Sequence, residues 1–169
     1  HEAGALDKAR DAFEEIVTLF PHTPDSFFAQ VEIAEILAEK GELPEAAKRL
    51  ESLAQSAEDS QVLPILMSLD KLYDKMGLLD QQAKVSEQIA ERASDSKILA
   101  EAALTLFDAG TPERALSVID KIDLAKLDSG TAYNLLVRHS ETLRENDPAT
   151  SIGILKKAVE TYPGEARPK

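Results

Sequence analysis

A short turn followed by an alanine-rich, helix-forming stretch recurs five times along this chain of 169 residues. The turns begin at Gly4, Gly41, Gly77, Gly110 and Asn146, in steps of 37, 36, 33 and 36 residues. Glycine, and less often asparagine, tolerates the left-handed backbone that ends a helix. A unit of this length, repeated in series, predicts stacked helical elements, each of which buries the apolar surface that its neighbour leaves exposed.

The turns are short enough to force the flanking helices into antiparallel hairpins. Pro44, Pro112 and Pro148 stand at or near a first helical position, where the missing N–H costs nothing. β-branched residues never cluster into a strand pattern, so the fold is predicted to be all-α. Helical periodicity predicts about nine helices. Their ranges are about 5–20, 25–40, 43–57, 61–76, 79–93, 96–109, 112–124, 130–145 and 148–161.

The alternation of small and large residues resembles the tetratricopeptide repeat family. Each hairpin has a first and a second helix. In the second helix at 5–20, Ala9, Phe13 and Ile16 precede a proline, and Ala46, Leu50 and Leu53 repeat this spacing in the next unit. Ser151, Leu155 and Ala158 do so again, as do Ala115, Ile119 and Ile122, while first helices carry the pairs Ala34 and Leu37, and Ala103 and Leu106. The resemblance implies a right-handed superhelical solenoid of antiparallel helix hairpins.

The resemblance also implies one solenoid domain over residues 1–169. It would consist of a partial repeat at 1–24, repeats at about 25–59, 60–95, 96–129 and 130–163, and a tail at 164–169. Several residues depart from the family pattern. Gln82, Ser86 and Asp70 replace expected small or apolar residues. In the helix at 130–145, the small and large sites are taken either by His139 and Thr142 or, if the following turn is one residue shorter, by Ser140 and Leu143.

The helix at 5–20 is predicted to be the second helix of a hairpin that begins upstream, so the chain is expected to be a slice of a longer, bacterial array. The sequence opens at His1 without a signal peptide. An uncapped helix exposes apolar side chains, which promotes association. We therefore expect self-association through Leu6, Phe13 or Ile16.

The net charge of −12 argues against nucleic acid and anionic membranes as ligands. No apolar run approaches the roughly 20 residues needed to insert across a bilayer. Residues 1–59 hold 14 acids and 5 bases, and this acidity is either a solvated face or a docking surface for a partner with a basic surface.

The residue types that carry chemistry are scarce. Cysteine is absent, and the three histidines, His1, His22 and His139, lack partners at metal-ligand spacing. Adjacent acids such as Glu14 and Glu15 are typical of solvated helix surfaces, and no glycine-rich phosphate loop occurs. The sequence therefore predicts no catalytic residue, no cofactor and no metal, and it disfavours an enzyme or small-ligand receptor.

In the resembled family the first helices line the concave side of the array. Carried over, this gives a candidate protein-binding groove of mixed charge: Phe28, Val31, Glu35, Glu39, Met67, Lys71, Lys75, Leu104, Phe107 and Tyr133. The alternative is that half of its apolar members belong to the core. The family's lysine and asparagine clamp for a terminal carboxylate is absent, since Lys71 is the only cation at the matching positions.

The predicted function is a non-catalytic scaffold that binds another protein or a peptide in this groove. The alternative is a structural spacer or self-association module without a groove ligand. By analogy of fold, a bacterial setting in envelope assembly or export is suggested, such as polysaccharide export, pilus or outer-membrane biogenesis. The absence of cysteine does not fix the compartment, although the periplasm or envelope is slightly favoured over the cytoplasm.

Overall fold

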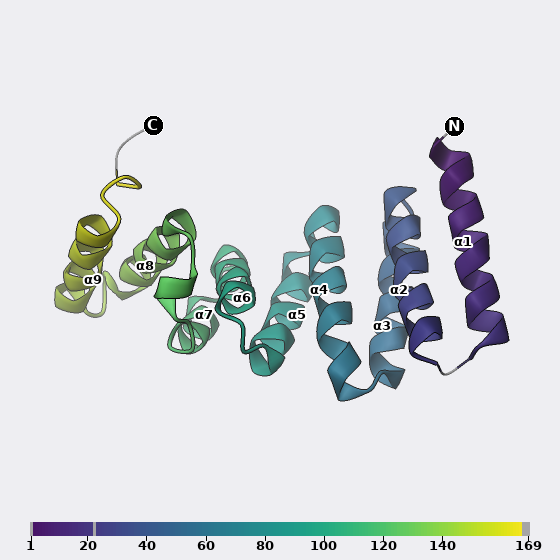
Figure 1. Cartoon of the computed structure of the whole chain (residues 1–169). Coiled ribbons are helices and arrows are strands. Elements are labelled where there is room, and N and C mark those ends of the chain that lie inside the picture. Colours follow the sequence, from purple (N-terminus) through teal and green to yellow (C-terminus); the bar gives the residue numbers. More distant parts are fainter. Residues whose placement is uncertain (1, 22, 167–169) are drawn as a thin grey trace. The chain divides into compact units, whose positions relative to one another are not determined.

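The computed structural model describes residues 2–21 and 23–166, and every regular element in these ranges is helical. Their order is α1 (Glu2–Leu19), α2 (Pro24–Glu39), α3 (Leu43–Ser56), α4 (Asp59–Met76), α5 (Leu79–Arg92), α6 (Ser96–Asp108), α7 (Pro112–Ile119), the 3-10 helix η1 (Leu124–Lys126), α8 (Ser129–Leu143) and α9 (Pro148–Thr161) (Figure 1). The prediction of an all-α fold with nine α-helices is confirmed for the described residues.

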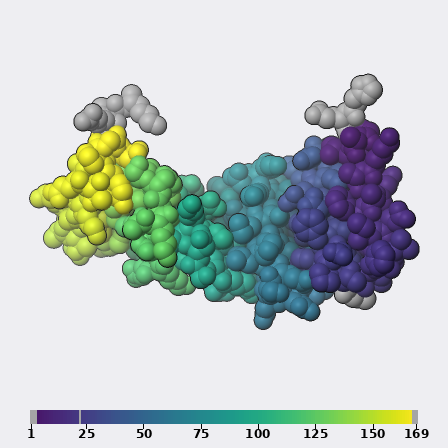
Figure 2. All heavy atoms as spheres, in the orientation of Figure 1, coloured from purple at the N-terminus to yellow at the C-terminus, as the bar shows by residue number. Residues whose placement is uncertain are grey.

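The chain divides into two compact units, His1–Val85 and Ser86–Lys169, with the boundary inside α5. In the first unit each helix from α1 to α4 packs against the next, and α2 also contacts α4. Successive helices are antiparallel, so α2 and α4 run in the same direction (Figure 1). Figure 2 shows, in the same orientation, the heavy atoms of these helices, from purple to blue, packed against one another.

Local chemistry explains where the helices of the first unit begin and end. Thr23 caps α2, because its side chain accepts a hydrogen bond of 3.1 Å from the backbone N–H of Ser26, and Pro24 follows at the first helical position. Gly41 and Gly77 follow α2 and α4 with φ of 83° and 67°. This left-handed backbone stops each helix and lets the next one begin within a few residues.

The core of the first unit is a set of branched side chains from successive helices. Ile33, Leu50 and Ile65 are at most 1% exposed. Ala34 and Ala46 are fully buried, and their small side chains let α2 and α3 approach closely. The predicted apolar faces of these helices are therefore the faces that pack.

In the second unit α6 packs against α7 and α8 against α9, while α8 also contacts α6 and α7. Leu99, Leu106 and Leu135 are at most 2% exposed and form the centre of this unit. The C-terminal half of α5 is tied to α7 by an ion pair of 2.8 Å between Arg114 and Glu87. The predicted hairpin pattern is thus present in each unit.

The predicted helix at 112–124 is wrong at its end, since α7 stops at Ile119. The chain turns there because Asp123 makes competing hydrogen bonds. Its carboxylate accepts from the N–H of Ala125 at 3.1 Å, and its own N–H donates to Ser96 Oγ at 3.1 Å. Such local bonds favour turns over continued helix. The other predicted helix ends lie within about three residues of those observed.

Gly4 is a second correction, because the predicted turn there does not exist. Gly4 lies inside α1, and it is not among the glycines with positive φ. The sequence leaves two registers open for the small and large sites of the helix at 130–145. The structure favours Ser140 over His139 at the small site, because Ser140 is 4% exposed whereas His139 is half-buried. Ser140 packs against Ser151 of α9, which lies 11 residues later in the chain.

Candidate protein-binding groove

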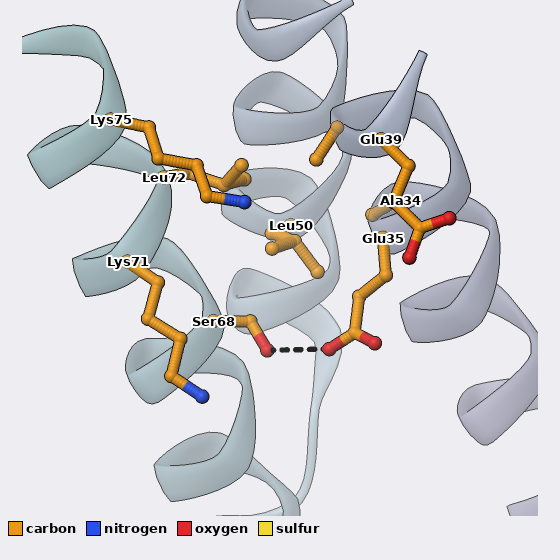
Figure 3. A pocket seen from close by; sticks show the side chains of 9 residues that line it. Ala34, Glu35, Glu39, Leu50, Ser68, Lys71, Leu72 and Lys75 are labelled. Carbon is orange, nitrogen blue, oxygen red and sulfur yellow. Dashed lines mark hydrogen bonds between the residues drawn. The ribbon is translucent and has the colours of Figure 1, made fainter. Parts of the chain in front are cut away.

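A hollow of about 220 Å³ lies between α2, α3 and α4 of the first unit. Its walls come from the two parallel helices α2 and α4, and α3 contributes to its floor (Figure 3). We call this hollow the α2–α4 groove. Its lining residues are Ala34, Glu35, Ala38, Glu39, Leu50, Ser68, Lys71, Leu72 and Lys75.

The α2 wall is acidic. Glu32, Glu35 and Glu39 are spaced by three and four residues, which places them on one face of the helix; we call them the acidic row. Burial raises the pKa of the half-buried Glu32, and the charges of Glu35 and Glu39 raise it further. The three carboxylates therefore repel one another, and a cation near them would lower that repulsion.

The α4 wall is basic. Lys71 and Lys75 are four residues apart and exposed, and they extend from α4 towards α2 (Figure 3); we call them the basic row. Ser68, one turn earlier on the same face, donates a hydrogen bond of 3.4 Å from Oγ to Oε1 of Glu35. This bond joins the two walls at one level of the groove.

The charges of the two walls remain apart. Within the part of the chain that the structure describes, neither Lys71 nor Lys75 forms an ion pair with an acid. The floor is buried apolar surface from Ala34, Leu50 and Leu72. The small side chains at Ala34 and Ala38 leave the space between the walls open.

A contrasting hollow lies between α1 and α3, with a volume of about 290 Å³. One ion pair of this hollow joins α1 to α3, because Arg49 Nη1 lies 2.9 Å from Glu14 Oε1. Lys40 Nζ similarly lies 2.8 Å from Asp7 Oδ1, and their hydrogen bond lowers the pKa of Asp7 and raises that of Lys40. These two pairs join helices within the fold, whereas the described charges on the two walls of the α2–α4 groove do not pair across it.

The structure brings together four of the predicted groove residues, Glu35, Glu39, Lys71 and Lys75. Phe28 lies on the α2 face that carries the acidic row and is 60% exposed. Val31 and Met67 are half-buried in the same unit. Their role as ligand contacts stays a prediction.

The remaining predicted groove residues belong to the second unit. Leu104 of α6 and Tyr133 of α8 are half-buried, whereas Phe107 is only 8% exposed and presents little surface to a ligand. Whether these three contact a partner stays a prediction. Sequence reasoning missed Ser68, although its position one turn before Lys71 was a usable signal.

The described residues contain no cluster of histidine and acidic side chains that could hold a metal ion. His139 is half-buried, and burial lowers its pKa although Asp120 opposes this. His1 and His22 lie outside the described residues. None of the described helices combines the length and apolar character that a bilayer span requires.

Two solved structures have the same fold over nearly the whole chain. The first contains nearly identical TPR-like repeats assigned to a kinesin light chain of Podosopora anserina, with a TM-score of 0.63, 16% identity, and coverage of 99% of this chain and 92% of that one. The second is a variant of those repeats, with a TM-score of 0.60, 17% identity, and coverage of 95% and 90%. No protein-family model matches the sequence, and no curated protein matches it. The likeness shows a tetratricopeptide-like helical-repeat fold.

Proposed function

We propose that this chain is a non-catalytic scaffold that binds an extended segment of another protein in the α2–α4 groove. One observation carries the proposal: opposite charges line the two walls of an open hollow and, among the described residues, do not pair across it. Charges that the fold does not use internally are available to a ligand.

The size of the groove supports a peptide over a small molecule. Its volume of about 220 Å³ is below the roughly 300–1,000 Å³ typical of small-molecule pockets. A hollow of this size holds one or two side chains of a longer segment whose backbone runs outside it. Helical repeats bind such segments because they present extended surfaces to their partners.

The proposal is tested by selecting binders from a displayed peptide library and re-measuring each one on two variants. Ser68→Trp places an indole in the groove, and we expect it to weaken the selected peptides by at least about tenfold. Gln55→Trp adds the same side chain at an exposed site of α3 that does not line the groove, and it should leave binding unchanged. Failure to select any peptide, or equal loss in both variants, would overturn the proposal.

Self-association is a second candidate function, and α9 provides the observation that favours it. Ile152, Leu155 and Val159 lie on one face of α9 and are 55%, 40% and 42% exposed. An apolar stripe of this kind favours contact with another protein surface. If it is an interface between copies, Leu155→Glu will lower the sedimentation coefficient of the wild-type oligomer; a monomeric wild type removes this candidate.

The predicted contact through α1 stays a prediction, with Leu6, Phe13 and Ile16 all half-buried in the structure. A partner with a basic surface is compatible with the acidic row of α2. The suggested role in bacterial envelope assembly also stays a prediction, and purification of partners from the source cells tests it.

A further inference from the structure

The two walls of the α2–α4 groove carry opposite charges at the same level of parallel helices. We propose that the groove selects a segment of mixed charge, in which a basic side chain meets the acidic row of α2 and an acidic side chain meets the basic row of α4. This rests on the proposed function and names the chemistry of the partner.

The acidic row supplies the first half of the selectivity. Glu35 and Glu39 line the groove, and Glu32 lies one turn before Glu35 on the same helix face. A lysine or arginine of the ligand placed here reduces the repulsion among three carboxylates as well as forming its own ion pair. An acidic side chain in the same place would add to that repulsion.

The basic row supplies the second half. Lys71 and Lys75 line the opposite wall, and no described acid pairs with either. An aspartate or glutamate of the ligand can approach both ammonium groups, because residues four apart are neighbours on a helix face. A basic side chain there would be repelled.

The hydrogen bond between Ser68 and Glu35 places these two requirements close together. A ligand that carries only basic residues is attracted by the acidic row of α2 and repelled by the basic row of α4. A ligand that carries only acidic residues is attracted by the basic row and repelled by the acidic row. Each wall therefore excludes what the other attracts, and repulsion contributes to the specificity as much as attraction does. The ligand's two charges must be near neighbours along an extended backbone.

Protonation gives an independent readout. Burial raises the pKa of Glu32, and the charges of Glu35 and Glu39 raise it further, so a cation bound beside the acidic row should lower it. Binding of a mixed-charge peptide is then linked to proton release from Glu32, and its affinity should fall as the pH drops through the pKa of this carboxyl, which is raised above the ordinary glutamate value.

The experiment compares peptides of equal length whose charged positions are lysine and glutamate together, lysine alone, glutamate alone, or glutamine. Fluorescence anisotropy measures their affinities for the wild-type chain. We expect the mixed peptide to bind about tenfold more tightly than either single-charge peptide. Equal affinities across the set, or a preference for one sign, overturn the inference.

Reversing one wall gives a sharper outcome. Lys71→Glu with Lys75→Glu makes both walls acidic and should move the preference to the lysine peptide; Glu35→Lys with Glu39→Lys should move it to the glutamate peptide. Lys156→Glu with Lys157→Glu, at exposed sites of α9, changes the net charge as much as the first variant does and should move nothing. An equal change in this control would show that net charge, and not the groove, sets the preference.

The two proposals fail in different ways. If selected peptides are lost in Ser68→Trp but show no dependence on charge pattern, the groove binds peptides and the mixed-charge inference is wrong. If Ser68→Trp has no effect on any peptide, the α2–α4 groove is not the binding site and the proposed function falls. The wild-type comparison needs no variant, so the inference stays testable even if a reversed wall impairs folding.

Discussion

Ser151 Oγ donates a hydrogen bond of 2.7 Å to the backbone carbonyl oxygen of Ser140, and the two side-chain oxygens lie 3.1 Å apart. Both serines are at most 5% exposed, so this contact lies inside the α8–α9 hairpin. Two small residues that face each other let the helices approach closely, and their hydroxyl groups satisfy each other there.

Ser151→Leu is expected to destabilise the chain by about 2–3 kcal/mol, because a larger side chain has no room between α8 and α9. Ser151→Ala keeps the size and loses only the hydrogen bonds, so it should cost about 1 kcal/mol. Urea unfolding followed by circular dichroism measures both. A smaller loss for leucine than for alanine would contradict the packing described.

Leu53→Asp tests the core of the first unit. Leu53 is 5% exposed, and the substitution removes a core side chain and buries a charge, so we expect a loss of about 4 kcal/mol or more. Ser52→Asp makes the same charge at the neighbouring exposed position and should change stability little. An unchanged melting temperature in Leu53→Asp would show that the core is wrongly assigned.

The cap that Asp147 forms at the start of α9 is expected to lose stability in acid. Hydrogen bonds from Thr150 lower the pKa of Asp147, and the backbone N–H donates at 3.1 Å. A carboxyl whose pKa is lower when folded contributes stability above its unfolded pKa of about 4 and loses it as pH falls through the folded value.

The N–H resonance of Thr150 should therefore titrate below the ordinary aspartate range in an NMR pH series. Asp147→Asn keeps an oxygen acceptor and removes the ionisation, so this titration should disappear. Asp74→Asn, at an exposed site of α4, is the control and should leave it unchanged. A midpoint at or above the ordinary aspartate value would contradict the cap.

The buried hydroxyl of Tyr73 is expected to make the stability of the chain depend on alkaline pH. Its hydroxyl donates to the Glu51 carboxylate, and burial, followed by the hydrogen bond and charge of Glu51, raises its pKa well above the ordinary value of 10. The unfolded chain then releases this proton first, so stability should fall as pH rises above about 10.

Tyr73→Phe should flatten this alkaline decline, and at neutral pH it should cost about 1–2 kcal/mol for the lost hydrogen bond to a charged acceptor. Tyr133→Phe makes the same change at a half-buried tyrosine and is the control. Urea midpoints between pH 7 and 11 measure both. An equally steep decline in Tyr73→Phe would place its origin elsewhere.

The helices and their order could be predicted because glycine spacing, proline positions and apolar periodicity all depend on local backbone physics. Gly41, Gly77 and Gly110 have the left-handed φ that their turns require. The end of α7 could not be predicted, because it depends on the contact between Asp123 and Ser96, which are far apart in sequence. Tertiary contacts override helix propensity at such points.

Two departures from the repeat pattern, Gln82 and Asp70, contact each other in the structure. Gln82 is 7% exposed, and its Nε2 donates a long hydrogen bond of 3.5 Å to Asp70 Oδ2. Each residue alone looks unsuitable for its site, whereas in the structure this contact joins them between α4 and α5. The position of such a partner is tertiary information that a single sequence does not contain.

The groove was predicted in part for a similar reason. Helical periodicity places Glu35 with Glu39, and Lys71 with Lys75, on single faces. It does not say which faces meet, how large the hollow is, or that Phe107 is buried. Those properties depend on how neighbouring hairpins pack.

The three turn glycines set the freedom of the joints between helices. A β-carbon added at Gly41, Gly77 or Gly110 would meet no atom within 4 Å, yet their φ values of 83°, 67° and 71° are strained for other residues. A substitution there therefore carries a backbone penalty of about 1–2 kcal/mol and no clash. Asparagine should lose least, so the joints can be stiffened, labelled or diversified one by one while the interior of each hairpin keeps its arrangement.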